Sequence, residues 1–219
     1  ETHKKGQVAM SALIKRKVSE VKEAVESAPD NDLSFVTRKI NVDSVVSTGS
    51  TLLDLAISGK RRRGGGMPGG IVVEMFGPAG SGKTALLAET CASAQLLGGE
   101  VKLLDPEARL DKEYARIYEM NITEQNYSRP DTVEDVFKEV LDWKPTDPSK
   151  INVIGTDSLA ALSTELEMDK GDKMGMKRAK EFSTGFRKTA RTISNNNWLM
   201  LCTNQIRQGD YGETTPGGM

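Results

Sequence analysis

The chain has 219 residues, which is enough for one domain with a buried core and a small appendage. Its 30 Lys and Arg residues nearly cancel its 31 Asp and Glu residues, so the overall charge predicts no binding partner. No segment approaches the ~20 apolar residues of a membrane span, and no signal-peptide pattern opens the chain, so we expect a cytoplasmic protein without a membrane partner.

The first regular pattern is a helical stripe near the N-terminus. Its apolar residues are Met10, Ile14, Val18, Val21 and Val25. A single helix of this kind is unstable in water, so we expect it to pack on its own core or on a neighbouring subunit. A turn-forming stretch around Pro29 follows. We therefore expect residues 1–32 to be an N-terminal helix and linker for oligomerisation, and residues 33–219 to be a core that is incomplete at its C-terminus.

After this turn, apolar strand-like runs alternate with helical patterns. The strands are predicted at 71–76, 100–105, 151–158 and 198–205, and the helices at 84–97, 132–143 and 178–194. Thr132 is the expected N-cap of its helix. The alternation predicts an α/β fold, a mostly parallel sheet with helices on both faces. Cys91 and Cys202 lie in apolar runs and are expected to be small buried hydrophobes.

The strongest motif is GPAGSGKT, which lies between a predicted strand and a predicted helix and fits the P-loop pattern. Its glycines let backbone N–H groups point at phosphate oxygens, and the following helix adds its positive N-terminal end. The predicted phosphate-binding residues are Gly77, Pro78, Ala79, Gly80, Ser81, Gly82, Lys83 and Thr84. Lys83 is expected to reach the β/γ-phosphates, and the Thr84 hydroxyl to bind Mg²⁺. An ordinary glycine-rich turn is the alternative, but pattern and context together favour a nucleoside triphosphate.

Three further residues are candidates for the chemistry of that nucleotide. Asp157 ends a predicted strand, where P-loop enzymes place the acid that holds Mg²⁺, although an isolated Asp there is often a cap. Glu107 follows the strand at 100–105 and is suited to orienting an attacking water. The Tyr114 ring is suited to stacking on a base. Taken alone, Glu107 and Tyr114 would by default be a surface glutamate and a half-buried tyrosine.

Several longer motifs share one order with a known family. They are VSTGSTLLDLAISG, GGMPGGIVVEMFGPAGSGKT, DPEARLDKEYAR, VIGTDSLAALSTELEMDKGDKMGM, CTNQIR and ETTPGG. From about Asn41 to its end the chain resembles the bacterial RecA recombinase family, in a divergent or phage-borne form. The STGS…LD, NQIR and ETTPGG stretches are far more specific than the P-loop. The resemblance implies a RecA-type P-loop NTPase that uses ATP and Mg²⁺.

The resemblance also implies roles for single residues of the nucleotide site. Glu107 falls on the catalytic glutamate and acts with Lys83. Asp111 and Tyr114 fall where the family contacts adenine. Gln205 falls on the glutamine that senses the γ-phosphate and passes its presence to a DNA-binding loop. One departure is Ala108, where the family usually has His.

The DNA-binding residues implied by the resemblance lie in two loops and in the basic helix between them. They are Met174, Gly175, Arg178, Arg187, Arg207, Gly217 and Gly218. The second loop, after Gln205, looks shorter than is usual in the family. From Lys170 to Arg191, eight Lys/Arg residues against two Asp/Glu residues give a net charge of +6. Such a run is ordinarily a solvated helix face, but beside these motifs it favours binding to nucleic acid.

The resemblance therefore implies an ATP-dependent recombinase for DNA recombination and repair, including the SOS response. It would form a helical homo-oligomeric filament on single-stranded DNA and pair it with homologous double-stranded DNA, with DNA-stimulated ATP hydrolysis. Two alternatives remain open. One is a hexameric helicase-type motor ATPase of the same superfamily, and the other is a nucleotide-gated DNA-binding scaffold with weak hydrolysis.

Overall fold

The structure is a computed structural model that describes residues 44–58, 65–164, 175–208 and 214–216. The predicted N-terminal helix and linker at 1–32 lie outside the described residues. So do three predicted DNA-binding residues, Met174, Gly217 and Gly218.

The chain forms alternating strands and helices, as the pattern predicts. In order they are β1 (Val45–Val46), α2 (Thr51–Ser58), β2 (Met67–Pro68), β3 (Ile71–Gly77), α3 (Lys83–Leu96), β4 (Val101–Leu104), α4 (Lys112–Ile117), β5 (Tyr127–Ser128), α5 (Val133–Asp142), β6 (Val153–Thr156), the 3-10 helix η3 (Leu159–Ala161), α7 (Gly175–Asn195), β7 (Leu199–Gln208) and β8 (Thr214–Pro216). Among the described residues, five parallel strands lie in the order β3-β7-β6-β4-β5. β1 and β2 form a separate antiparallel pair.

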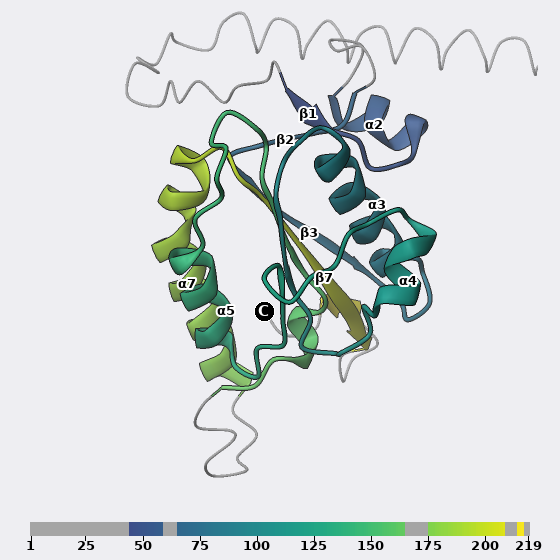
Figure 1. The fold of residues 1–219 in the computed structure, drawn as a ribbon. Coiled ribbons are helices and arrows are strands. Elements are labelled where there is room, and N and C mark those ends of the chain that lie inside the picture. Colours follow the sequence, from purple (N-terminus) through teal and green to yellow (C-terminus); the bar gives the residue numbers. More distant parts are fainter. Residues whose placement is uncertain (1–43, 59–64, 165–174, 209–213, 217–219) are drawn as a thin grey trace, which may run out of the picture. The chain divides into compact units, whose positions relative to one another are not determined.

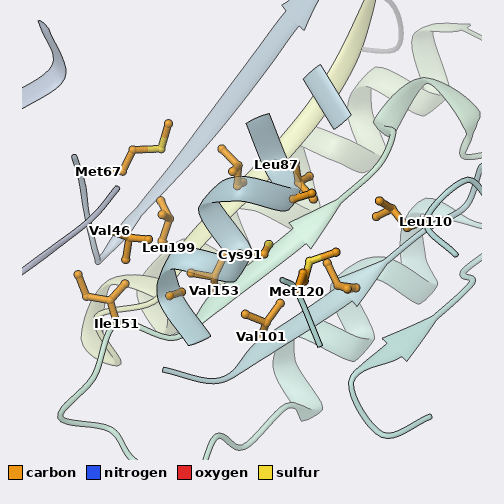
Figure 2. Packing of buried hydrophobic residues seen from close by; sticks show 14 of the residues in the cluster. Val46, Met67, Leu87, Cys91, Val101, Leu110, Met120, Ile151, Val153 and Leu199 are labelled. Carbon is orange, nitrogen blue, oxygen red and sulfur yellow. The ribbon is translucent and has the colours of Figure 1, made fainter. Parts of the chain in front are cut away.

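Helices cover both faces of the central strands (Figure 1), with α3 and α4 on one side and α5 and α7 on the other. One buried cluster joins α3 to the sheet and includes Leu87, Cys91 and Val153 (Figure 2). A second cluster lies under α5 and α7. Within β7, Leu201 belongs to the first cluster and Cys202 to the second. The strand is therefore buried on both faces, which explains its uninterrupted apolar run.

Both cysteines lie in these clusters, and the prediction that they are buried is confirmed. Burial raises the pKa of Cys91 to about 12. Burial also raises the pKa of Cys202 to about 12. Thiols of this kind remain protonated and unreactive near neutral pH.

The helix α5 begins where its sequence predicts. Thr132 is the N-cap, and its Oγ1 accepts a hydrogen bond from the backbone N–H of Asp135 at 3.1 Å. The Asp135 carboxylate in return accepts from the backbone N–H of Thr132 at 3.2 Å, which completes a capping box. Helix α7 packs against α5 at Gly185, where the Phe137 ring occupies the space that a side chain would fill.

The STGS…LD stretch has a structural role. Asp54 of α2 is buried, and its carboxylate accepts from Ser47 Oγ at 2.5 Å, from Thr48 N at 2.8 Å and from Thr48 Oγ1 at 2.6 Å. Burial acts to raise the pKa of Asp54, but the hydrogen bonds from Ser47 and Thr48 outweigh it and lower that pKa. The motif thus fixes the turn that leads into α2.

The last strand differs from its predicted bounds. The sequence pattern ends this strand at Gln205, whereas β7 continues to Gln208. Residues 206–208 pair with β8 in antiparallel fashion, with Arg207 opposite Thr215. This pairing with β8 continues the strand beyond the apolar run that the sequence pattern detects. Within the described ranges, no helix combines the length and the apolarity that crossing a bilayer requires.

Candidate nucleotide-binding site

The P-loop leaves the carboxyl end of β3 and enters α3. Gly80 and Gly82 have φ angles of +73° and +86°, and a Cβ added to either would meet nothing within 4 Å. Glycine is therefore required there by the backbone conformation and not by lack of space. The N-cap of α3 is Gly82, which has no side chain and so leaves the N–H groups of the first turn without a side-chain cap. The backbone N–H groups of such a helix start are suited to binding an anion.

Lys83 and Thr84 point from the first turn of α3 toward the carboxyl ends of the strands. Lys83 Nζ donates to the carbonyl oxygens of Gly77 at 3.1 Å and of Pro78 at 2.8 Å. Thr84 Oγ1 donates to Asp157 Oδ2 at 2.7 Å. Thr84 of α3 and Asp157, which follows β6, are the two predicted Mg²⁺ ligands, and the structure brings them into direct contact.

The other carboxylate oxygen of Asp157 accepts a hydrogen bond from Thr203 Oγ1, a contact that the sequence did not suggest. Asp157 is buried, and burial raises its pKa, against the opposing effect of the hydrogen bonds from Thr203 and Thr84. The neighbouring carboxylates of Glu107 and Asp105 raise this pKa further. A hydroxyl and a carboxylate oxygen side by side, next to a phosphate cradle, suit Mg²⁺, which prefers oxygen ligands and keeps several waters.

Glu107 is the second carboxylate of the site. Its Oε1 accepts from Ser158 Oγ and, at 3.4 Å, from Gln205 Nε2. Its Oε2 pairs with Arg109 Nε at 2.8 Å. Ser158 and Arg109 were not predicted from the sequence. Ser158 directly follows the strand-end Asp157, which is the one signal that points to it. Arg109 lies inside the DPEARLDKEYAR motif, but its sequence position assigned it no role.

These residues surround one cavity of about 290 Å³. Its described lining consists of P-loop residues 79–85 together with Glu107, Arg109, Tyr114, Asp157, Ser158 and Gln205. The structure therefore brings together the side chains of Lys83, Thr84, Glu107, Asp157 and Gln205, which come from four separate segments of the chain. Gly77 and Pro78 contribute through the carbonyl oxygens that hold Lys83.

The two predicted adenine contacts differ in placement. Tyr114 lines the cavity, with its ring 5.1 Å from that of Tyr118. Burial, followed by the hydrogen bond with the Tyr118 hydroxyl, raises the pKa of Tyr114, so the phenol is neutral. Asp111 is exposed and serves as the N-cap of α4, where its Oδ1 accepts from Tyr114 N at 2.7 Å. Among the described residues, the cavity lining includes Tyr114 but not Asp111.

Of the predicted DNA-binding residues, two have described side chains. Arg178 is half-buried, and its Nη1 donates to the carbonyl oxygen of Leu162 at 3.2 Å. Arg187 is exposed on α7, and its Nε donates to the carbonyl oxygen of Ser183 at 3.2 Å. Gly175 is the first residue of α7, and Arg207 lies in β7.

Comparison with known proteins shows the family of the chain. The family model of the RecA N-terminal domain matches residues 30–219. "Protein RecA" of Gluconobacter oxydans (strain 621H) is 40% identical over 182 residues, which cover 80% of this chain and 51% of that protein. "Protein RecA" of Xanthomonas campestris pv. campestris (strain B100) is 35% identical over 190 residues, covering 83% of this chain and 53% of that protein. The chain thus spans about half the length of the curated relatives that it matches. By these matches and by its α/β fold, the chain belongs to the RecA family.

Proposed function

We propose that the protein is an ATP-dependent DNA recombinase that hydrolyses ATP to ADP and phosphate. The observation that carries this proposal is the meeting of the P-loop, Glu107, Asp157 and Gln205 in one cavity at the carboxyl ends of the strands. Family membership supports the same activity. A phosphate cradle alone would fit many nucleotide-binding proteins, whereas a held carboxylate beside it fits hydrolysis.

Each residue has a distinct task in this proposal. The P-loop N–H groups and Lys83 bind the phosphates. Thr84 and Asp157 would hold Mg²⁺, which supplies positive charge against the phosphate oxygens. Glu107 orients the attacking water and accepts its proton. Because Glu107 makes contacts from both of its oxygens, its carboxylate has a defined direction before the substrate binds.

Gln205 is proposed to connect the nucleotide to DNA. Its Nε2 contacts Glu107 at 3.4 Å, and its own strand leads directly into the segment where the second DNA-binding loop is predicted. A terminal phosphate that binds Gln205 would compete with this contact and so change the start of that segment. Single-stranded DNA, and then homologous double-stranded DNA, would bind there, with subunits assembled into a helical filament. The basic side chains predicted for DNA contact would bind phosphates, so affinity would fall steeply with salt.

The decisive experiment is an ATPase assay on the full protein with and without single-stranded DNA. We expect DNA to stimulate hydrolysis, Lys83→Ala to abolish it, and Glu107→Gln to abolish it while nucleotide binding persists. Equal rates with and without DNA would reject the recombinase proposal. Electron microscopy of the same sample distinguishes open filaments from the closed hexamers of a helicase-type motor.

A further inference from the structure

Arg109 lies at the mouth of the nucleotide cavity because of a tight turn in the backbone. Ala108 has a φ of +55°, an uncommon conformation for a residue with a side chain. The turn is held by a hydrogen bond from Ala108 N to the carbonyl oxygen of Asp105 at 3.1 Å. A second bond runs from Leu110 N to Asp105 Oδ2 at 2.8 Å. Both hydrogen bonds end on Asp105, which is fully buried, and the turn is followed by Arg109, whose Nε reaches Glu107 Oε2.

The resulting ion pair joins an enclosed carboxylate to an accessible cation. The Glu107 side chain is 10% exposed, whereas that of Arg109 is 64% exposed. The pair uses Arg109 Nε, and a guanidinium carries four further N–H donors. The carboxylate is therefore held in place from the protein side, while the guanidinium is accessible to a bound ligand.

The charges that line the cavity show why this cation matters. Among the described lining residues, Lys83 and Arg109 are cations, and Glu107 and Asp157 are anions. Two positive and two negative charges leave the lining neutral. Without Arg109 these side chains would carry one positive and two negative charges, so Arg109 adds to the positive charge that Mg²⁺ would supply to the terminal phosphate. Arg109 also lines a neighbouring cavity together with Ala160 and Ala161, so its side chain is shared by the two cavities.

We propose that Arg109 selects nucleoside triphosphates over diphosphates and releases Glu107 when a triphosphate is bound. This inference rests on the proposed ATP hydrolysis. With an empty or diphosphate-bound site, Arg109 stays paired with Glu107 Oε2. A terminal phosphate competes for the guanidinium, since Arg binds phosphate oxygens through parallel N–H donors.

The released Glu107 Oε2 then accepts a proton from the attacking water. The water oxygen forms the new bond to the γ-phosphorus, and the bridging P–O bond breaks with its electron pair remaining on ADP. Glu107 afterwards returns the proton to solvent. Hydrolysis is thus coupled to the presence of the group to be cleaved.

The test compares Arg109→Ala, Arg109→Lys and a control, Arg116→Ala, in the full protein with Mg²⁺. Arg116 is also exposed and pairs with a glutamate, Glu113 Oε1, at 2.9 Å, but it lies on α4 outside the cavity lining. Equilibrium affinities are measured for a non-hydrolysable ATP analogue and for ADP. One charged hydrogen bond to a partly exposed group predicts about a tenfold loss of analogue affinity in Arg109→Ala. The affinity for ADP should change by no more than about twofold, which corresponds to less than half of the free energy of one such hydrogen bond.

Arg109→Lys keeps the charge and should recover part of the loss, and Arg116→Ala should leave both affinities unchanged. Equal weakening for both nucleotides, or no weakening, in a folded Arg109→Ala protein overturns the inference and leaves the proposed function standing. A wild-type protein that binds neither nucleotide overturns both. The analogue-to-ADP affinity ratio is the informative readout, because a purely structural effect of the substitution would change both affinities together.

Discussion

Replacing Gly185 with alanine tests how closely α5 and α7 pack. A Cβ at this position would lie 2.1 Å from Phe137 Cδ2 and 2.2 Å from its Cε2, whereas ordinary contacts begin near 3.4 Å. The ring would have to move by more than 1 Å. It has little freedom, because Phe182 and Phe186 lie edge-on to it with ring centroids 6.3 and 4.9 Å away.

The magnitude follows from two opposing effects. Overpacking a buried site costs about 1–3 kcal/mol, and a contact this short belongs at the upper end of that range. Alanine in place of glycine inside a helix contributes about 1 kcal/mol in the other direction. We therefore expect Gly185→Ala to lower the free energy of unfolding by about 2 kcal/mol.

Urea denaturation followed by circular dichroism measures this change as a lower midpoint at an unchanged slope. Ala190→Gly, at an exposed position of the same helix, is the control for helix propensity and should cost about 1 kcal/mol. Adding Phe137→Leu to Gly185→Ala should cost less than the sum of the single changes, because the smaller side chain relieves the contact. A Gly185→Ala protein as stable as the wild type, or strictly additive substitutions, would refute the packing argument.

Two further predictions concern single residues. Glu119 follows α4 in a Schellman motif, with a φ of +57° that favours glycine. Urea denaturation should therefore show that Glu119→Gly stabilises the protein by about 0.5–1 kcal/mol and that Glu113→Gly, inside α4, destabilises it. Changes in stability of the same sign for both variants would contradict this explanation. Asp157→Asn should raise the free energy of unfolding at pH 7 without nucleotide, because the buried carboxylate is costly when ionised. Since the Asp157 pKa is raised, the wild type loses stability as pH rises through that pKa, and the gap between the two proteins should narrow as pH falls. A gap that does not change between pH 7 and pH 4 would exclude this explanation.

The sequence predicted the parts of the fold that local patterns determine. Alternating apolar runs predicted the α/β order, and the GPAGSGKT stretch predicted the cradle, because glycine spacing and flanking elements are local properties. Thr132 was identifiable as an N-cap for the same reason. The strand order was not predictable in this way. It places β7 between β3 and β6, and so brings Gln205 close to Glu107 although 98 positions separate them.

The contacts that orient the site were also beyond local patterns. The contacts of Thr203 with Asp157 and of Ser158 with Glu107 depend on strand pairing, since each joins two different segments of the chain. Arg109 depended on the left-handed turn at Ala108, which an alanine does not signal. The DNA contact of Arg178 stays a prediction, and its guanidinium donates through Nη1 to the Leu162 carbonyl oxygen. A count of charges along the sequence does not reveal which basic side chains donate hydrogen bonds to backbone carbonyl oxygens.

The three consecutive residues near the end of the parallel part of β7 each touch a different acid. Thr203 contacts Asp157, Asn204 Nδ2 donates to Glu74 Oε1 at 2.7 Å, and Gln205 contacts Glu107. Because side chains alternate between faces along a strand, a slip of one residue would separate all three pairs at once. Residues 203–205 should therefore tolerate single substitutions more readily than an insertion or a deletion. An insertion or deletion there would separate β7 from Asp157, from Glu107 and from Glu74 of β3 in a single event.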